Sequence, residues 1–408
     1  MIVSIDWLKD YVELDMPLEE LADKLTIAGL ECVIKEVGKS IPQGVVVGKV
    51  LEKKAHPNAD SLSVCKVDVG GPEVLNIVCG APNVDKDQFV PVATVGTKLT
   101  PDFVIKKAKL RGEPSMGMIC AEDELGLGND HSGIIVLEGE HTLGTPYSEY
   151  FKSSKILDVD ITANRPDAMS HWGVAREIAA IYDKEFKKIP VELNETGPLL
   201  SGLANVEVSA PEACPRYTAR VIKDVKIGPS PEWLVERLEA LGLRSINNVV
   251  DASNYVLMET GHPLHVFDYD KLKGQAINIR FANKGEKITT IDHKERELSE
   301  DMLLICDGEE AIALAGIMGG SESEVSDNTA NVLIESAYFE PAVIRKGSKQ
   351  EQLSTDASKR FERGTDPNET LVYAQDRLAA LILDLAGGTL AKGMIDVYPN
   401  HISKKIAK

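Results

Sequence analysis

The polar residues Asn254, His262, His265 and Asp268 fall within fifteen consecutive positions of the chain. Amide, imidazole and carboxyl groups can hold and orient a water molecule when a rigid apolar frame fixes them. The same stretch offers such a frame in Val249, Val250, Leu264, Val266 and Phe267. The spacing therefore indicates a candidate hydrolytic site.

A metal site is an alternative interpretation of the same run. His262, His265 and Asp268 could be ligands, because a catalytic zinc ion takes three protein ligands and a water molecule. The HxxH spacing alone is a weak signal, and no cysteine lies close in sequence. For His262, which precedes Pro263 and is therefore expected in extended backbone, a core or capping histidine is the simpler interpretation. A metal-dependent hydrolase stays open at this point.

Three further segments could add groups to such a site. Residues 315–320 (AGIMGG) contain adjacent glycines that let a backbone approach a ligand, although a plain turn explains them equally well. Glu335 ends an apolar run, where a carboxylate is either exposed or, if buried, a functional candidate. Residues 353–367, rich in hydroxyl and charged groups, predict a helix capped near Ser354 or Thr355 and ended at Gly364.

The elements that must position these residues follow from the pattern of apolar residues. Residues 44–140 form short β-type runs broken by Gly, Pro and Asn, which favours a small barrel or sandwich. The predicted strands are 45–50, 65–69, 76–79, 89–93 and 133–137.

On either side of this region the pattern changes. A helix is predicted from about Pro17, because Leu18, Leu21, Ala22 and Leu25 share one face. A strand at 156–162 and a second helix follow the β region, and residues 189–203 are the clearest linker. Residues 204–398 mix strands and helices without a βαβ rhythm, which predicts an α+β domain.

Composition limits the possible functions. The chain has 408 residues, 43% of them hydrophobic, and a formal charge of −19, which argues against non-specific coating of nucleic acid. One basic cluster could still touch RNA, although a solvated hairpin surface is the simpler interpretation. It consists of Lys98, Lys106, Lys107, Lys109 and Arg111.

Cysteines and apolar runs bear on the cellular compartment. Six scattered cysteines without CxxC pairs predict reduced core thiols, and hence a cytoplasmic protein. The longest apolar run, 311–318, is too short to span a bilayer, and the first residues do not resemble a signal peptide. We therefore expect no membrane partner.

In their order along the chain, these motifs resemble the β subunit of bacterial phenylalanyl-tRNA synthetase. The resemblance runs through 56–60 (HPNAD), 77–83 (IVCGAPN), 110–118 (LRGEPSMGM), 160–167 (DITANRPD) and 175–180 (AREIAA). It continues through 247–268, 315–320, 335–337 and 355–367. Each motif is modest alone, but their number and order make chance a poor explanation.

The resemblance implies a multidomain α+β architecture. Residues 1–39 plus 152–195 would form a split N-terminal α+β domain, into which an OB-type tRNA-binding β-barrel (40–151) is inserted. Residues 204–398 would form an α+β editing domain of the B3/B4 type. Residues 399–408 would begin a linker to a missing C-terminal half, so the chain is expected to be an amino-terminal portion.

The resemblance also implies a function. The domain of the B3/B4 type would hydrolyse tyrosine mischarged onto tRNA(Phe), and the chain would bind tRNA. Aminoacylation would belong to the full enzyme, a heterotetramer with the synthetase α subunit that uses ATP and Mg²⁺. No cofactor and no metal are expected in this portion.

Site roles are implied at the matching positions. Glu335 would accept a hydrogen bond from the hydroxyl of tyrosine, while His265 and Asn254, with Ser253, would position the water and the tRNA end. The remaining matched positions would line the pocket; these are Gly319, Gly320, Thr355 and Ala357. The tRNA-binding positions would be Lys106, Lys107, Lys109 and Arg111.

Two departures and two rival functions accompany the resemblance. The family usually carries Gln where this chain has His262, and often Thr where it has Ser253. The rivals are a non-catalytic tRNA-binding scaffold and the metal-dependent hydrolase centred on His262, His265 and Asp268.

Overall fold

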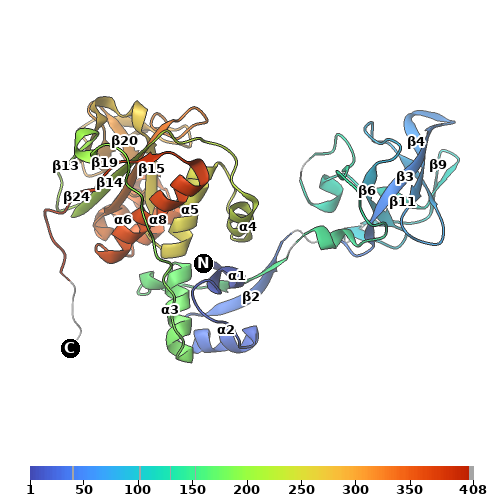
Figure 1. Cartoon of the computed structure of the whole chain (residues 1–408), viewed down its shortest axis with the longest axis horizontal. Helices are drawn as coiled ribbons and strands as arrows, with labels where there is room; N and C mark the ends of the chain where they lie inside the picture. The colour runs from blue at the N-terminus through green and yellow to red at the C-terminus, as the bar shows by residue number, and fades with distance from the viewer. Residues whose placement is uncertain (39–40, 101–102, 129, 152, 404–408) are drawn as a thin grey trace. The chain divides into compact units, whose positions relative to one another are not determined.

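The computed structural model describes residues 1–38, 41–100, 103–128, 130–151 and 153–403, so the last part of the expected linker, 404–408, lies outside the described residues. It divides into two compact units, one formed by 1–35 with 155–408 and the other by 36–154. Figure 1 shows the elements of each unit in chain order.

A five-stranded antiparallel sheet forms the unit 36–154. Its strands run in the order β11 (Gly117–Ile119), β6 (Phe89–Thr94), β3 (Val45–His56), β4 (Ala59–Asp68) and β5 (Leu75–Cys79). In β4, which contains most of the strand predicted at 65–69, Cys65 and Val67 are buried while the intervening Lys66 is exposed, as expected of a strand with one buried face. The first and last strands approach each other, since Met116 N–H donates to Asn76 O at 2.7 Å. The sheet is thus a nearly closed barrel.

The strand predicted at 133–137 is wrong. Only Leu137 makes an isolated bridge, to Phe89. Both backbone groups of Ile134 are taken by the side chain of Asn83, whose amide donates to Ile134 O and whose oxygen accepts from Ile134 N–H. A backbone satisfied by an Asn side chain has no group left for a ladder at that residue.

Two short hairpins extend the barrel unit. They are formed by β7 (Lys98–Thr100) with β8 (Phe103–Val104) and by β9 (Ala108–Leu110) with β10 (Glu113–Ser115). The four basic residues Lys106, Lys107, Lys109 and Arg111, here named the barrel patch, are all exposed on or beside the second hairpin.

The other unit contains a small sheet, two strands of which directly precede and follow the unit 36–154 in the sequence. The sheet has the order β1 (Ile2–Ser4), β12 (Ser154–Val159) and β2 (Cys32–Val37). Three helices accompany it: α1 (Ile5–Leu8), α2 (Leu18–Ile27) and α3 (His171–Tyr182). Helix α2 begins directly after Pro17 and buries Leu21, Ala22 and Leu25, as the spacing predicts.

Two larger sheets form the rest of this unit. One has the order β15 (Leu264–Asp268), β22 (Asn331–Tyr338), β14 (Arg216–Lys223) and β23 (Thr389–Leu390), and β24 (Ile395–Val397) also pairs with β14. The second has the order β13 (Asn205–Val208), β16 (Ala276–Phe281), β19 (Leu303–Cys306), β20 (Ala311–Leu314) and β21 (Met318–Gly319). A hairpin joins β17 (Lys287–Thr289) to β18 (Glu295–Glu297).

Five helices complete the unit: α4 (Glu232–Ala240), α5 (Asn248–Thr260), α6 (Pro341–Glu351), α7 (Asp356–Phe361) and α8 (Glu369–Ala386). Strand β22 is buried on both faces. Val332 and Ile334 belong to the core that includes α5 and α8, whereas Leu333 and Ala337 belong to the core that includes the second sheet. The arrangement of α5 and α8 beside β15 is visible in Figure 1.

The sequence expectations about membranes and thiols can be compared with the structure. Among the described residues, no helix is both long and apolar enough to cross a bilayer. All six cysteines are free thiols, and all are buried.

Candidate functional site

His265 and Glu335 are direct partners across neighbouring strands. In the antiparallel pair β15–β22, His265 lies opposite Glu335, and on the other side of β22 Ala219 of β14 lies opposite the same residue. Residues opposite each other point to the same face of a sheet, with Cβ atoms about 4.5–5.5 Å apart. The sheet therefore brings together two of the predicted site residues that are far apart in sequence.

Glu335 is a buried acid with one tyrosine partner. Glu335 is only 5% exposed. Tyr217 Oη donates a hydrogen bond to Glu335 Oε2 at 3.2 Å. Burial raises the pKa of Glu335 to about 8, while the hydrogen bond from Tyr217 acts in the opposite direction. Among the described residues, no group donates to the other oxygen, Oε1. The carboxyl group thus keeps one oxygen available for a ligand.

His265 carries a neutral imidazole ring that lies against Gly319. Burial of the ring lowers the pKa of His265 to about 4, so the imidazole is uncharged at neutral pH. Its Nε2 atom is buried and has no hydrogen-bond partner among the described residues. The ring meets the edge of Phe267, with centroids 4.4 Å apart. A neutral imidazole with a free nitrogen can accept a proton from, or orient, a water molecule.

Gly319 lies directly against this ring, whereas Gly320 faces elsewhere. A Cβ atom on Gly319 would come within 2.8 Å of His265 Cε1 and 3.1 Å of Nε2, so a larger residue there would have to displace the imidazole. Gly320 N–H donates to Ile312 O at 2.8 Å, and the residue borders a small cavity of about 160 Å³ beside β17 and β20. The structure therefore places Gly319, but not Gly320, in contact with His265.

Thr355 and Ala357 lie at the start of α7, next to the glycine-containing loop. Thr355 caps α7 by accepting from Ser358 N–H, as the sequence predicts, and its hydroxyl also donates to Ile317 O at 3.0 Å. Ala357 is partly buried against the core that contains the second sheet. Helix α7 is thereby tied to the residue just before Met318 and Gly319.

Ser253 and Asn254 occupy a partly exposed stripe of α5. Ser253 Oγ donates to Leu264 O, the carbonyl adjacent to His265, at 3.4 Å. The side chain of Asn254 makes no hydrogen bond to any described residue. The helix thus brings Ser253 to the backbone beside His265.

The three residues of the metal alternative do not form one group. His262 is 1% exposed, its ring meets the edge of Phe361, and burial lowers its pKa to about 4. Asp268 Oδ2 accepts from Thr329 Oγ1 at 2.7 Å, and the residue caps the turn that follows β15. In the part of the chain that the structure describes, no three His, Cys, Asp or Glu side chains form a cluster that could hold a metal ion.

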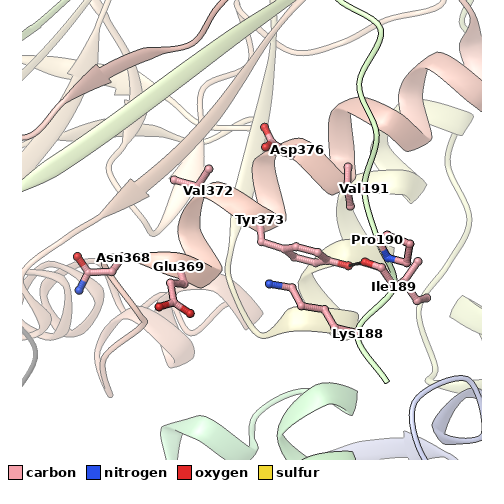
Figure 2. A pocket seen from close by; sticks show the side chains of 9 residues that line it. All are labelled: Lys188, Ile189, Pro190, Val191, Asn368, Glu369, Val372, Tyr373 and Asp376. Carbon is pink, nitrogen blue, oxygen red and sulfur yellow. Dashed lines mark hydrogen bonds between the residues drawn. The ribbon is translucent and has the colours of Figure 1, made fainter. Parts of the chain in front are cut away.

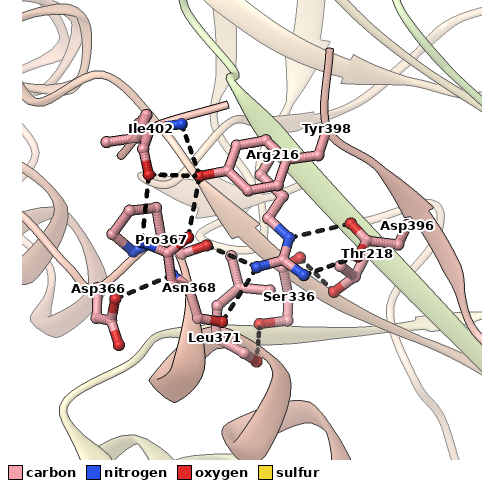
Figure 3. A network of polar contacts seen from close by, with 10 residues as sticks. All are labelled: Arg216, Thr218, Ser336, Asp366, Pro367, Asn368, Leu371, Asp396, Tyr398 and Ile402. Carbon is pink, nitrogen blue, oxygen red and sulfur yellow. Dashed lines mark hydrogen bonds and ion pairs between the residues drawn. The ribbon is translucent and has the colours of Figure 1, made fainter. Parts of the chain in front are cut away.

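A polar network lies on the face of the sheet opposite to Glu335 (Figure 3). The guanidinium of Arg216 makes a two-pronged ion pair with Asp396 of β24, at 3.0 and 2.7 Å, and its remaining amino group donates to Pro367 O and Asn368 O. Ser336, the neighbour of Glu335, donates to Leu371 O of α8 at 2.9 Å. Strand β22 is therefore bonded on one face while it presents Glu335 on the other.

The barrel patch borders a groove with exposed apolar side chains. The groove, of about 620 Å³, is lined in part by Phe103, Val104, Lys106 and Leu110. Phe103 is 50% exposed, which is unusual for an aromatic residue. The lining of the groove thus includes a half-exposed aromatic ring and a basic side chain, two kinds of group that can contact single-stranded nucleic acid.

A second open cavity, of about 710 Å³, contains none of the predicted site residues. It lies between residues 188–191, where the predicted linker begins, and the first turns of α8. Figure 2 shows Tyr373 pointing from α8 to the linker, where its hydroxyl donates to Ile189 O at 2.8 Å, and Lys188 Nζ lies 4.2 Å from the centre of the Tyr373 ring. The predicted linker is thus held on α8 by specific contacts.

Tyr217 is the residue of this site that the sequence analysis missed. It is fully buried and bonded to a residue 118 positions away. Its strand reads as a mixed run of buried residues in which a tyrosine is ordinary, and only the pairing of β14 with β22 links it to Glu335.

Comparison with known proteins places this geometry in context. Residues 213–387 match the family model described as the B3/4 domain, and 45–146 match a putative tRNA binding domain. The phenylalanine–tRNA ligase beta subunit of Geobacter sulfurreducens is 50% identical over 99% of this chain and 50% of its own length. The same subunit of Syntrophus aciditrophicus is 47% identical over 98% of this chain and 50% of its own length.

A solved structure gives a more distant likeness. An amino-terminal fragment of the phenylalanyl-tRNA synthetase beta-subunit from Pyrococcus horikoshii is 17% identical, with a TM-score of 0.33 over 60% of this chain and 67% of that one. At this level the likeness adds nothing to the assignment. The chain spans about half the length of the curated relatives it matches. On the identity to those relatives and the two matched domains, the chain belongs to the family of phenylalanine–tRNA ligase beta subunits.

Proposed function

We propose that this chain edits tRNA(Phe) by hydrolysing tyrosine that has been attached to it in error. The observation that carries the proposal is the pairing of a neutral His265 with a buried Glu335 on one face of a sheet. Within a B3/4 domain, this pair combines a group that can orient water with a group that can recognise a hydroxyl.

Editing answers a real chemical difficulty. Tyrosine is phenylalanine with one added hydroxyl, and an apolar pocket rejects an added hydroxyl by only about 10²-fold. A second site that binds the hydroxyl through a hydrogen bond discriminates better, because an amino acid without the hydroxyl leaves a buried polar group unpaired. The proposal gives that recognition to Oε1 of Glu335, and the bond of Tyr217 to the other oxygen, Oε2, supports it.

The hydrolytic step uses the residues around Glu335. His265 orients the attacking water, and Ser253 and Asn254 hold the tRNA end and the water. Gly319 lets the substrate approach beside the imidazole, with Gly320, Thr355 and Ala357 as further lining. Breaking an ester needs an oriented water and donors for the developing oxyanion.

Partners and cofactors follow from the same proposal. The barrel patch contacts the phosphates of tRNA(Phe), and the barrel is of the OB type. The synthetase α subunit is the protein partner, and the full cytoplasmic enzyme performs ATP- and Mg²⁺-dependent phenylalanylation. The domain limits of 1–39 plus 152–195, 40–151 and 204–398 are part of this proposal.

Deacylation of tyrosyl-tRNA(Phe) by the chain tests the proposal. We expect hydrolysis that persists in the presence of a chelator and that falls when His265→Ala or Glu335→Ala is introduced, with the thermal unfolding profile retained. Unchanged hydrolysis in both variants would refute the assignment. Loss of hydrolysis on chelation favours the metal-dependent hydrolase, and tRNA binding without any hydrolysis favours the scaffold.

A further inference from the structure

We infer that Tyr217 is a positioning residue that sets which oxygen of Glu335 faces the substrate and thereby contributes to the choice of tyrosine over phenylalanine. The inference rests on the proposed editing function. Tyr217 does not reach the substrate itself. It acts through the carboxyl group to which it is bonded.

The geometry makes Tyr217 a fixed donor. Its side chain is fully buried, and its strand neighbour Ala337 belongs to the same core, so the ring cannot turn away without disturbing packed residues. Burial, and then the nearby Glu335, raise the pKa of Tyr217 well above its ordinary value, so the phenol keeps its proton. Its hydroxyl therefore donates to Glu335 Oε2 at any working pH.

This bond divides the two oxygens of Glu335 between two roles. With Oε2 held by Tyr217, Oε1 is the oxygen left for a ligand. When the carboxyl group is ionised, Oε1 accepts from the substrate phenol; when it is protonated on Oε1, that O–H donates to the phenol oxygen. In both states the hydroxyl of tyrosine is bonded, whereas the ring of phenylalanine leaves Oε1 without a partner.

Without the hydroxyl of Tyr217, the carboxyl group loses this orientation. Oε2 would then compete with Oε1 for any proton or water in the pocket. The titratable groups that surround Glu335 are Tyr217, Cys214 and His265, and the thiol of Cys214 has a pKa raised by burial. Of these, only Tyr217 makes a hydrogen bond to the carboxyl group among the described residues.

The test compares Tyr217→Phe with Tyr269→Phe. Tyr269 is a matched control because its buried hydroxyl, in the same core, donates to Leu203 O and not to Glu335. The ratio of kcat/KM for deacylation of tyrosyl-tRNA(Phe) to that of phenylalanyl-tRNA(Phe) should fall roughly tenfold in Tyr217→Phe, the size of one hydrogen bond between uncharged groups. It should stay unchanged in Tyr269→Phe.

A second readout does not depend on activity. The ¹³C signal of the Glu335 carboxyl group, identified by its loss in Glu335→Gln, should titrate at higher pH in Tyr217→Phe than in the unmodified chain. If Glu335→Gln lowers the ratio while Tyr217→Phe changes neither the ratio nor the titration, this inference is overturned and the editing proposal stands. If Glu335→Gln leaves the ratio unchanged, the editing proposal itself fails.

Discussion

Replacing Glu335 with Gln should change how the stability of the larger unit depends on pH. The carboxyl group titrates near 4.5 when unfolded and at about 8 when folded. Because folding raises the pKa of Glu335, the native state binds this proton more tightly than the unfolded state does. The stabilisation that the protonated carboxyl group gives the native state is complete below pH 4.5. Between pH 4.5 and about pH 8 the unfolded state has lost the proton while the native state still holds it, so each rise in pH favours unfolding. Above about pH 8 the native carboxyl group is ionised as well.

The magnitude follows from the width of that window. Each pH unit inside it changes the free energy of unfolding by about 1.4 kcal/mol. Glu335→Gln lacks this titration, so its free energy of unfolding relative to the unmodified chain should rise by roughly 2–3 kcal/mol between pH 5 and pH 7. Other titrating groups are common to both chains and cancel in the difference.

Urea unfolding followed by tryptophan fluorescence measures the difference. The three tryptophans, Trp7, Trp172 and Trp233, all lie outside 36–154, so the signal reports on the unit that contains Glu335. Glu309→Gln is the control, because Glu309 is exposed on the turn between β19 and β20. A difference for Glu335→Gln that does not vary with pH would refute the reasoning, because it would mean that water reaches the carboxyl group.

Three further predictions concern the site and its supports. Gly319→Ala should lower the deacylation rate on the order of a hundredfold by displacing the imidazole of His265, and an unchanged rate would show that this close contact is not needed. Alanine at all four residues of the barrel patch should weaken tRNA binding and reduce the slope of log Kd against log salt concentration by about 0.7–0.9 per lost phosphate contact; an equal slope in filter binding would contradict this. Arg216→Lys cannot keep both the two-pronged pair with Asp396 and the bonds to the carbonyl groups of Pro367 and Asn368 just before α8. It should lower the free energy of unfolding by about 2 kcal/mol, which a urea midpoint equal to that of the unmodified chain would disprove.

The pattern of apolar residues predicted individual helices and strands better than it predicted which strands pair with each other. The apolar stripe of α2 and the strand predicted at 65–69 are properties of neighbouring residues, and the structure confirms both. The strand at 133–137 failed because Asn83, fifty positions away, supplies the hydrogen bonds that a neighbouring strand would have supplied. Such competition by a side chain is invisible to hydrophobic periodicity.

The site shows the same limit. The run from Asn254 to Asp268 drew attention to His265, but nothing in its spacing indicates Glu335 as the cross-strand partner. That pairing depends on the register of β15 against β22, which the sequence pattern does not fix. Family resemblance supplied the candidates, and their roles stay predictions. Neither the spacing of the polar residues nor the family resemblance indicated Tyr217.

The three-stranded sheet β1–β12–β2 has a consequence for how this chain can vary. Strand β12 lies between β1 and β2, and Asp160 N–H bonds to Glu31 O while Lys35 pairs with Asp158, so the chain leaves and re-enters this unit at adjacent points. A segment whose two ends meet in one sheet can be removed or exchanged at little cost in loop-closure entropy. Replacing the barrel with a few glycines is therefore expected to leave the strands that hold His265 and Glu335 in place.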